Sequence, residues 1–367
     1  MKNKKKILLI FGTRPEAIKL VPVIKAFQAS DRIELKICVS AQHREMLDSV
    51  LNEYSISADW DLDVMEKSQT LDLITAKILC GVGKVIDNYS PDLILVHGDT
   101  STAFASALSA FYRRIPVGHI EAGLRSGNLL SPHPEEFNRR AISLMARYHF
   151  APTALAANNL LAEGIAKESI FTVGNTAIDI LKSNLKDIDI QNSSELIKKP
   201  LILITVHRRE HGEDELLSIF RAIRTVCSAH PEIRAIYPLH KNPKLRQMAR
   251  IELDRIKNLT LCEPLETKAF HSLLYSSHIV LTDSGGIQEE AAFLGKPTLV
   301  LRDTTERPEG IVAGVLRLVG SDSGIISKNI DLLLGSKDEY LKMSKPTDAF
   351  GDGNTGERIA RITEKLL

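Results

Sequence analysis

The sequence lacks a charge imbalance and a long apolar run near its start. Its 47 Lys and Arg residues balance 46 Asp and Glu residues, so no overall field attracts nucleic acid or a membrane surface. The first apolar run, Ile7–Phe11, is too short for a signal peptide or a membrane span. We therefore expect a cytoplasmic protein in which any anion site is local.

Cysteines are few and far apart, and the common nucleotide-loop fingerprints are missing. The four cysteines form no C-x-x-C pair: they are Cys38, Cys80, Cys227 and Cys262. Because Cys38 and Cys262 lie in apolar, strand-like runs, we expect buried free thiols in a reducing compartment. The turn after the first strand has neither a G-x-G-x-x-G nor a Walker A pattern. We expect no cofactor.

The chain is long enough for two domains. Its 367 residues exceed what one core usually holds. Apolar strand-like runs alternate with helical patterns along both halves, which indicates parallel sheets. We predict two Rossmann-like, doubly wound α/β domains, over residues 1–175 and 176–352. A final helix, about 353–367, has no strand after it and is expected to pack back on the first domain.

The most informative stretch is residues 279–310. A buried strand, Ile279–Thr282, leads through Ser284, Gly285 and Gly286 into a helical pattern. A helix start with small residues presents free N–H groups and a positive dipole end, which suits a phosphate. Arg307 could add a bidentate cation. An ordinary strand–turn–helix fits this stretch equally well when it is taken alone.

Polar residues also follow the predicted strands of the first half. Arg14, Gln42, Asp99 and Glu121 each come at the carboxyl end of a strand, where doubly wound sheets bind ligands. Helix capping explains any one of them but fits the whole set less well. A metal is a weaker alternative. Imidazoles and carboxylates alternate in His97-Gly98-Asp99 and His119-Ile120-Glu121, but no recognised ligand spacing is present, so we expect no metal.

Eight motifs then carry a resemblance across nearly the whole chain. In order they are FGTRPEAIKLVPV, AQHREMLD, VHGDT, GHIEAGLR, PEE-x-NR, HRRE, LTDSGGIQEE and TTERPE. The sequence closely resembles the bacterial non-hydrolysing UDP-N-acetylglucosamine 2-epimerases. The resemblance implies a GT-B type fold with the UDP-sugar in a cleft between the domains, and a homodimer. It also implies interconversion of UDP-GlcNAc and UDP-ManNAc for surface polysaccharide synthesis.

The resemblance implies roles for individual residues. The catalytic set is Asp99, Glu121 and Glu135 as acid/base carboxylates, with His207 facing the phosphates or sugar. The substrate-binding set is Arg14, Lys19, Arg139, Leu265, Phe270, Ser284, Gly285, Gly286, Glu290 and Arg307, with Glu290 on the ribose and Phe270 beside the uracil. A second, activating UDP-GlcNAc would contact Gln42, Gln69, Arg208 and His240. Departures from the family pattern are Glu45, Ser68, His211 and Val315.

The chemistry explains why carboxylates are needed. The proton on carbon 2 is removable once the bond from carbon 1 to UDP begins to break, so the site must stabilise UDP and supply bases. The intermediate is 2-acetamidoglucal. Alternatives are a hydrolysing relative that releases UDP and ManNAc, a 2-epimerase for a modified UDP-sugar, a GT-B glycosyltransferase, and a non-catalytic sugar-nucleotide sensor.

Overall fold

The computed structural model describes residues 4–41, 44–66, 69–186, 199–206, 212–240 and 242–367. Two compact units result: Met1–Ile180 with Gly351–Leu367 (unit 1), and Leu181–Phe350 (unit 2). The predicted boundary at 175/176 falls at the start of helix α7, Thr176–Lys186, and that helix continues across the division at Ile180.

Unit 1 is a seven-stranded sheet in the order β3-β2-β1-β4-β5-β6-β7. All its strand pairs are parallel. Its elements are β1 Lys5–Phe11, α1 Arg14–Gln28, β2 Ile33–Val39, α2 Arg44–Glu53, β3 Trp60–Asp61, α3 Leu71–Tyr89, β4 Leu93–His97, α4 Ser101–Tyr112, β5 Val117–Ile120, α5 Glu135–Met145, β6 Tyr148–Ala151, α6 Ala154–Ala162, a 3₁₀ turn at Lys167–Ser169, β7 Ile170–Thr172, the first part of α7, and α15 Thr355–Leu366. The strand order reverses between β1 and β4.

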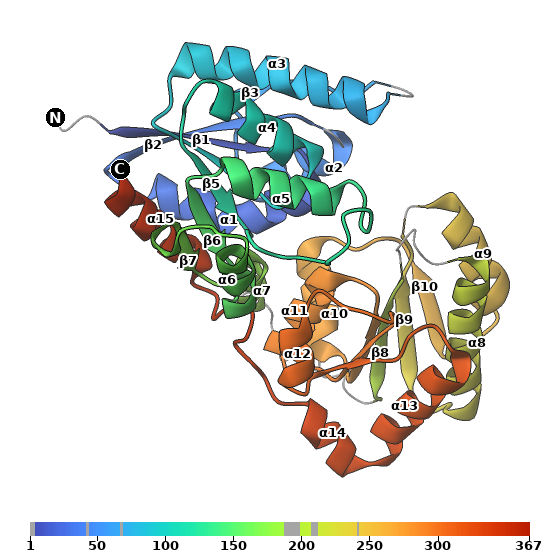
Figure 1. The fold of residues 1–367 in the computed structure, drawn as a ribbon. Helices are drawn as coiled ribbons and strands as arrows, with labels where there is room; N and C mark the ends of the chain where they lie inside the picture. Colours follow the sequence, from blue (N-terminus) through green and yellow to red (C-terminus); the bar gives the residue numbers. More distant parts are fainter. Residues whose placement is uncertain (1–3, 42–43, 67–68, 187–198, 207–211, 241) are drawn as a thin grey trace. The chain divides into compact units, whose positions relative to one another are not determined.

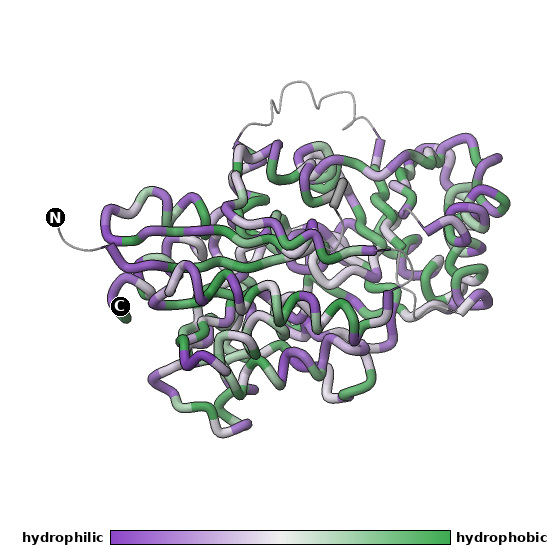
Figure 2. The backbone as a smooth tube through the Cα atoms, turned by 90° about the horizontal axis from the view of Figure 1, so that it is seen from above, coloured by the Kyte–Doolittle hydropathy of each residue, from purple (hydrophilic) through white to green (hydrophobic). Residues whose placement is uncertain are grey.

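Two apolar layers cover the two faces of this sheet. Alternate residues of β1 point to opposite faces, so Leu8 and Ile10 pack with α3 and α4. Ile7, Leu9 and Phe11 pack with α1, α2 and α15. All five side chains are fully buried, which stabilises the fold by about 1.5–3 kcal/mol each. The hydrophobic residues accordingly run along the strands (Figure 2).

The last helix returns to unit 1, in agreement with the expected packing. Figure 1 shows α15 beside α1, and its buried face joins the same apolar layer. Close approach requires a glycine, because a Cβ on Gly356 would lie 2.6 Å from the Pro22 carbonyl carbon. The Gly356 amide also donates to Asp179 Oδ1 at 2.8 Å.

Unit 2 repeats the architecture with a six-stranded sheet in the order β10-β9-β8-β11-β12-β13. Every strand pair is again parallel. Its elements are β8 Leu201–Thr205, α8 Glu213–Ala229, β9 Arg234–Pro238, α9 Pro243–Leu253, β10 Leu259–Cys262, α10 Thr267–Ser276, β11 Ile279–Thr282, α11 Gly285–Phe293, β12 Thr298–Val300, α12 Pro308–Val312, β13 Leu316–Leu318, α13 Ser323–Gly335 and α14 Lys337–Met343. One apolar layer lies under α8, α9 and α13, and another under α10 and α11.

The predicted fold class, two doubly wound parallel-sheet domains, is confirmed. Two local expectations change. Trp60 lies in the short edge strand β3 instead of a loop. Cys38 is buried as expected, whereas Cys262 is only half-buried, because it ends the edge strand β10, which has a neighbouring strand on one side only. No helix in the described part of the chain is long and apolar enough to cross a membrane.

Candidate functional site

The turns after β1, β4 and β5 build the candidate site of unit 1. Arg14 begins α1 after β1, Asp99 follows β4, and Glu121 follows β5 directly. These strands are neighbours and parallel, so their carboxyl ends meet at one sheet edge, at the point where strand order reverses. The structure thus brings together the polar strand-end residues that the sequence singled out. Gln42 lies outside the described residues.

A buried carboxylate that the sequence reasoning did not select ties two of these turns together. Glu16 accepts hydrogen bonds from the amides of Gly12 (3.1 Å) and Thr13 (2.8 Å), and from the Thr100 hydroxyl (2.8 Å). Thr13 caps the same helix, which makes a capping box. The T-x-x-E spacing of Thr13 and Glu16 could have revealed it. The amides of Gly12 and Thr13 are therefore already occupied by the protein's own carboxylate.

Burial raises the pKa of Glu16 to about 6, and the four hydrogen bonds around it act against that rise. The group holds the Gly12-Thr13 turn and the Asp99-Thr100 turn at a fixed separation. Its location links the helix that carries Arg14 and Lys19 to the strand end that carries Asp99.

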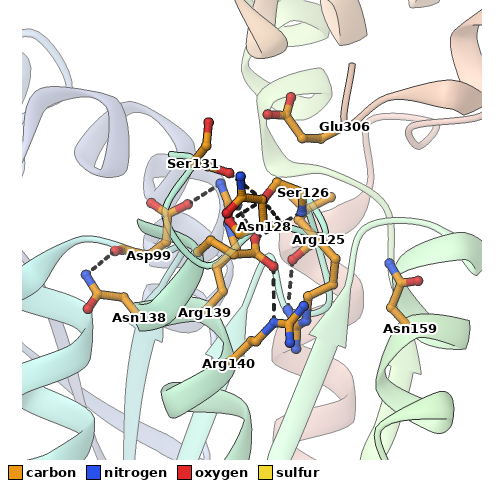
Figure 3. Close-up of polar contacts among 12 residues, drawn as sticks. Asp99, Arg125, Ser126, Asn128, Ser131, Asn138, Arg139, Arg140, Asn159 and Glu306 are labelled. Carbon is orange, nitrogen blue, oxygen red and sulfur yellow. Dashed lines mark hydrogen bonds and ion pairs between the residues drawn. The ribbon is translucent and has the colours of Figure 1, made fainter. Parts of the chain in front are cut away.

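Helix α5 holds Asp99 at two points (Figure 3). The Arg139 guanidinium lies 2.7 Å from Asp99 Oδ2, and the Asn138 amide donates to the Asp99 carbonyl at 2.8 Å. Burial raises the pKa of the Asp99 carboxyl, and the charges of Glu121 and Glu135 raise it further, while Arg139 opposes them. The other two predicted acid/base carboxylates, Glu121 and Glu135, therefore lie near enough to Asp99 to raise its pKa.

Arg139 is itself held in place by a buried partner. Its second terminal nitrogen lies 2.9 Å from Glu136 Oε2, and Glu136 also accepts from the Ser126 amide and from Arg140. Glu135 is the first residue of α5, where the sequence predicted the start of a helix, and it is half-buried.

The backbone conformation of Glu121 and three neighbouring side chains determine the position of its carboxylate. Its φ of 65° is left-handed, an uncommon value for a residue with a side chain. One carboxylate oxygen, Oε2, forms an ion pair with Lys19 Nζ and accepts from Asn175 Nδ2 at 3.1 Å. His97 Nε2 is 3.8 Å from the same oxygen. All three neighbours therefore approach the same carboxylate oxygen, Oε2.

The buried histidines His97 and His119 lie on opposite faces of the unit 1 sheet. Burial lowers the pKa of His97 to about 4 and that of His119 to about 3. His119 contacts the Gly98 carbonyl at 2.7 Å, whereas His97 lies on the opposite face of the sheet with Glu121. Strand alternation would place the side chains of His97 and Asp99 on the same side, but it does not extend to Asp99, because β4 ends at His97 and Gly98 has a positive φ. In the described ranges no three His, Cys, Asp or Glu side chains are grouped to hold a metal.

The predicted phosphate motif of unit 2 is an open helix start. Helix α11 begins at Gly285 after Ser284, and no described side chain caps its first amides. The Ser284 amide instead donates inward to Thr282 Oγ1 at 3.0 Å, and the Thr205 hydroxyl donates to the same atom at 2.7 Å. This start differs from that of α1, because its N–H groups remain available for an anion.

Arg307 lies directly over this helix start. A Cβ on Gly285 would come within 2.8 Å of the Arg307 guanidinium carbon, so only glycine admits the arginine there. Arg307 Nε donates to Glu289 Oε1 at 2.8 Å, and its Nη1 lies 3.5 Å from Glu306. Glu306 also holds Arg302 through two contacts, of 2.8 and 3.0 Å. The network fixes a cation beside the open amides.

The remaining predicted residues of unit 2 lie around α10 and α11. Leu265 and Phe270 are half-buried at the border of the apolar layer under these helices. Glu290, on α11, has its Oε1 3.5 Å from His271 Nε2. His271 did not emerge from the sequence, since an isolated histidine on a helix has no distinguishing pattern.

The predicted activator residues make local contacts or fall outside the described residues. Gln69 accepts from the Glu66 amide (2.9 Å) and donates to the Val64 carbonyl (3.1 Å), and His240 Nδ1 accepts from the Asn242 amide (3.2 Å). Arg208 lies outside the described residues, as does the predicted catalytic His207. The second site therefore stays a prediction.

The fold and these sites define the class of two-domain, Rossmann-like α/β proteins. The model of the family described as UDP-N-acetylglucosamine 2-epimerase matches residues 25–364. A UDP-N-acetylglucosamine 2-epimerase of Bacillus subtilis is 46% identical over 366 residues, covering 100% of this chain and 96% of that protein.

Solved structures agree with the family model. The Neisseria meningitidis UDP-GlcNAc 2-epimerase bound to UDP-GlcNAc is 45% identical with a TM-score of 0.93, covering 98% of this chain and 100% of the other. The Methanocaldococcus jannaschii UDP-GlcNAc 2-epimerase in complex with UDP-GlcNAc and UDP is 34% identical with a TM-score of 0.85, covering 98% and 99%. The chain belongs to the UDP-N-acetylglucosamine 2-epimerase family, as the motifs predicted.

Proposed function

We propose that the protein is a non-hydrolysing isomerase that interconverts UDP-GlcNAc and UDP-ManNAc and so supplies surface polysaccharide synthesis. The observation that carries this proposal is the grouping of Glu121, at the end of β5, and Glu135, at the start of α5, around Asp99, whose pKa their charges raise. Membership of the family gives these carboxylates a substrate, since the Neisseria relative binds UDP-GlcNAc.

The reaction is an elimination followed by an addition. A carboxylate takes the proton from carbon 2, the electrons of that bond form a double bond to carbon 1, and the carbon–oxygen bond to UDP breaks. Glu121, ionised beside Lys19, suits proton removal, while Asp99, with its raised pKa, suits delivery of a proton to the other face. UDP then adds back to carbon 1. His207, in the predicted catalytic set, would assist at the phosphates or sugar.

Unit 2 supplies the proposed nucleotide site. The open amides of Gly285 and Gly286 and the guanidinium of Arg307 offer hydrogen bonds and positive charge to the diphosphate. Phe270 lies beside the base, Leu265 contributes there mainly through its backbone, and Glu290 accepts from the ribose hydroxyls. Arg14, Lys19, Arg139 and Ser284 complete the substrate set. Holding UDP after its bond breaks is what separates re-addition from hydrolysis.

The test is proton NMR of purified protein with UDP-GlcNAc in deuterated water. We expect UDP-ManNAc to accumulate to an equilibrium, with deuterium at carbon 2 of the sugar. Release of UDP and free ManNAc would identify a hydrolysing enzyme instead. Bound but unchanged UDP-GlcNAc would favour a glycosyltransferase or a sensor. Faster turnover of a 6-deoxy or uronic acid analogue would identify a 2-epimerase for a modified sugar.

We also infer a homodimer formed through unit 1. Large apolar side chains are exposed on two adjacent helices of that unit: Phe111 and Tyr112 on α4, and Phe137 and Leu144 on α5, with Leu144 79% exposed. Such a patch is unusual on a monomer. Light scattering should give twice the chain mass, and Leu144→Glu should shift the protein toward monomer. A wild-type monomer would contradict the inference.

The proposed compartment is the cytoplasm. Its support is the set of four free thiols, two of which, Cys38 and Cys227, are buried. Burial raises the pKa of Cys227 to about 11, which keeps it a protonated, unreactive core residue.

A further inference from the structure

Three polar side chains, one each on α7, α10 and α11, follow one another in contact beside the apolar layer under α10 and α11. Asn184 of α7 contacts His271 of α10, with 3.0 Å between Asn184 Nδ2 and His271 Nδ1. The other ring nitrogen, Nε2, lies 3.5 Å from Oε1 of Glu290 on α11. Asn184 and His271 are both 2% exposed, and the Glu290 side chain is 15% exposed. All three belong to unit 2.

The chemistry of the three groups fixes the position of the imidazole proton. The Asn184 NH₂ group can only donate, so His271 Nδ1 must accept. A neutral imidazole then carries its proton on Nε2, which faces the Glu290 carboxylate. The opposite tautomer would place a lone pair against a carboxylate oxygen. Asn184 therefore sets the tautomer, and His271 presents a donor to Glu290.

The two carboxylate oxygens of Glu290 therefore have different surroundings. Oε1 lies 3.5 Å from His271 Nε2, which favours one orientation of the carboxylate and leaves Oε2 to accept from a ligand. A carboxylate held in this way reads a pair of adjacent hydroxyls better than a freely rotating one, because less motion is lost on binding.

We propose that His271, oriented by Asn184, is a positioning residue for Glu290 and thereby sets the preference of the nucleotide site for ribose over 2′-deoxyribose. The inference rests on the proposed function, in which Glu290 accepts from the ribose hydroxyls. A buried polar pair that served stability alone would affect ribo- and deoxyribonucleotides equally. The ratio of their affinities therefore separates positioning from structure.

The experiment measures the dissociation constants of UDP and 2′-deoxy-UDP by calorimetry. The variants are His271→Phe, Asn184→Leu and Glu290→Gln. The control is His278→Phe, since His278 lies before β11 and stacks on Tyr340, at 4.0 Å between ring centroids. Wild type should bind UDP about tenfold or more tightly than 2′-deoxy-UDP, the size of one hydrogen bond to a charged group.

In His271→Phe and in Glu290→Gln the preference should fall toward one, because UDP loses its contacts from both ribose hydroxyls whereas 2′-deoxy-UDP has only the 3′-hydroxyl contact to lose. Asn184→Leu should reduce it partly, and the control should keep the wild-type ratio. A wild-type ratio near one would overturn the ribose role of Glu290 and this inference with it. A wild-type preference that survives in His271→Phe would overturn the role of His271 alone.

Two further measurements keep these outcomes distinct. Deuterium exchange at carbon 2 by the wild type tests the proposed function without reference to ribose, so either idea can fail while the other stands. Nitrogen-15 NMR of labelled histidine in the wild type should show His271 as the Nε2–H tautomer. An Nδ1–H signal would overturn the proposed role of Asn184 and His271 in positioning Glu290, and this test does not depend on whether His271→Phe folds.

Discussion

Single residues at the start of α1 and α11 contrast two ways of using a helix N-terminus. At α1 the amides are taken by the protein's own carboxylate, Glu16, whereas at α11 they stay open beside Arg307. The first arrangement makes a rigid corner and the second makes a place for an anion. One substitution at each helix start tests this contrast.

The first prediction concerns the stability of Glu16→Gln. Because the folded-state pKa of Glu16 is raised from 4.5 to about 6, its contribution to stability is full below pH 4.5 and is lost as pH rises through 6. The loss is about 2 kcal/mol, given 1.36 kcal/mol per pKa unit. A neutral glutamine does not titrate, so the variant lacks this pH-dependent loss. The free energy of unfolding of the variant minus that of the wild type should therefore rise by about 2 kcal/mol between pH 4.5 and pH 7.

Urea unfolding at both pH values, followed by the fluorescence of Trp60, measures this difference. Trp60 is the only tryptophan and lies in unit 1 with Glu16. A difference between variant and wild type that stays constant with pH would show that Glu16 does not titrate in this range.

The second prediction concerns Gly285→Ala. The added methyl would meet the Arg307 guanidinium at 2.8 Å and displace it from Glu289. UDP binding should weaken about tenfold to a hundredfold, as for one charged hydrogen bond, while the helix itself tolerates alanine. Calorimetry measures the affinity. Gly335→Ala is the control, because it also lies in unit 2, outside the nucleotide site, and no atom lies within 4 Å of its Cβ position.

Non-additivity gives the sharper check of this mechanism. If the methyl acts through Arg307, adding Gly285→Ala to Arg307→Ala should cost little further affinity. Fully additive losses would mean that the alanine acts on the amides directly.

At the scale of elements, α7 and α15 connect distant parts of the chain. Asn175, just before α7, donates to Glu121 in unit 1, and Asn184, within α7, contacts His271 in unit 2. Helix α15 returns after unit 2 to cover α1, which carries Arg14 and Lys19. The elements that support the sites are therefore far from them in sequence.

The third prediction tests the docking of α15. Gly356→Ala places a methyl 2.6 Å from the backbone of Pro22, which cannot move away like a side-chain end. Unit 1 should lose about 1–3 kcal/mol, the usual cost of overpacking. Chemical unfolding followed by Trp60 fluorescence measures the loss. Gly335→Ala, with open space at the end of α13, should leave stability within about 0.5 kcal/mol, and equal effects of the two would contradict the close approach.

At the scale of the whole molecule, the two units carry different acid sensitivity. The strands of unit 1 bury His97, His119 and His149, all with pKa values lowered by burial. A lowered folded-state pKa gives stability that is full above pH 6.5 and is lost as pH falls toward the folded value. For His97 the loss is about 3 kcal/mol by pH 4, from the same 1.36 kcal/mol per unit. Glu16, Asp99 and Asp179 offset part of this loss, because burial raises their pKa values. In unit 2, burial likewise lowers the pKa of His278.

The fourth prediction follows from that difference. On acidification from pH 6.5 to 4, unit 1 should unfold in less urea than unit 2. Trp60 fluorescence reports unit 1 alone, and far-UV circular dichroism reports both units, so the two transitions should separate as pH falls. Transitions that coincide at every pH would show that the units unfold together. His97→Gln should move the fluorescence transition toward its neutral-pH position.

The sequence alone determined the fold class, most strand and helix positions, and the strand-end residues of both halves. It could do so because parallel strands are short buried runs and because the polar residues that follow them are local in sequence. It also determined the family, through eight ordered motifs.

The tertiary structure alone decided how these residues are held. Glu16 contacts Thr100, Asn175 contacts Glu121, and Asn184 contacts His271, each across at least 54 positions of chain. No periodicity or spacing encodes such pairs, because they depend on how helices pack against strands that neighbour one another only in space. The same reason makes the proton on His271 a property of the fold: it is set by a donor on another helix, and no local pattern could place it.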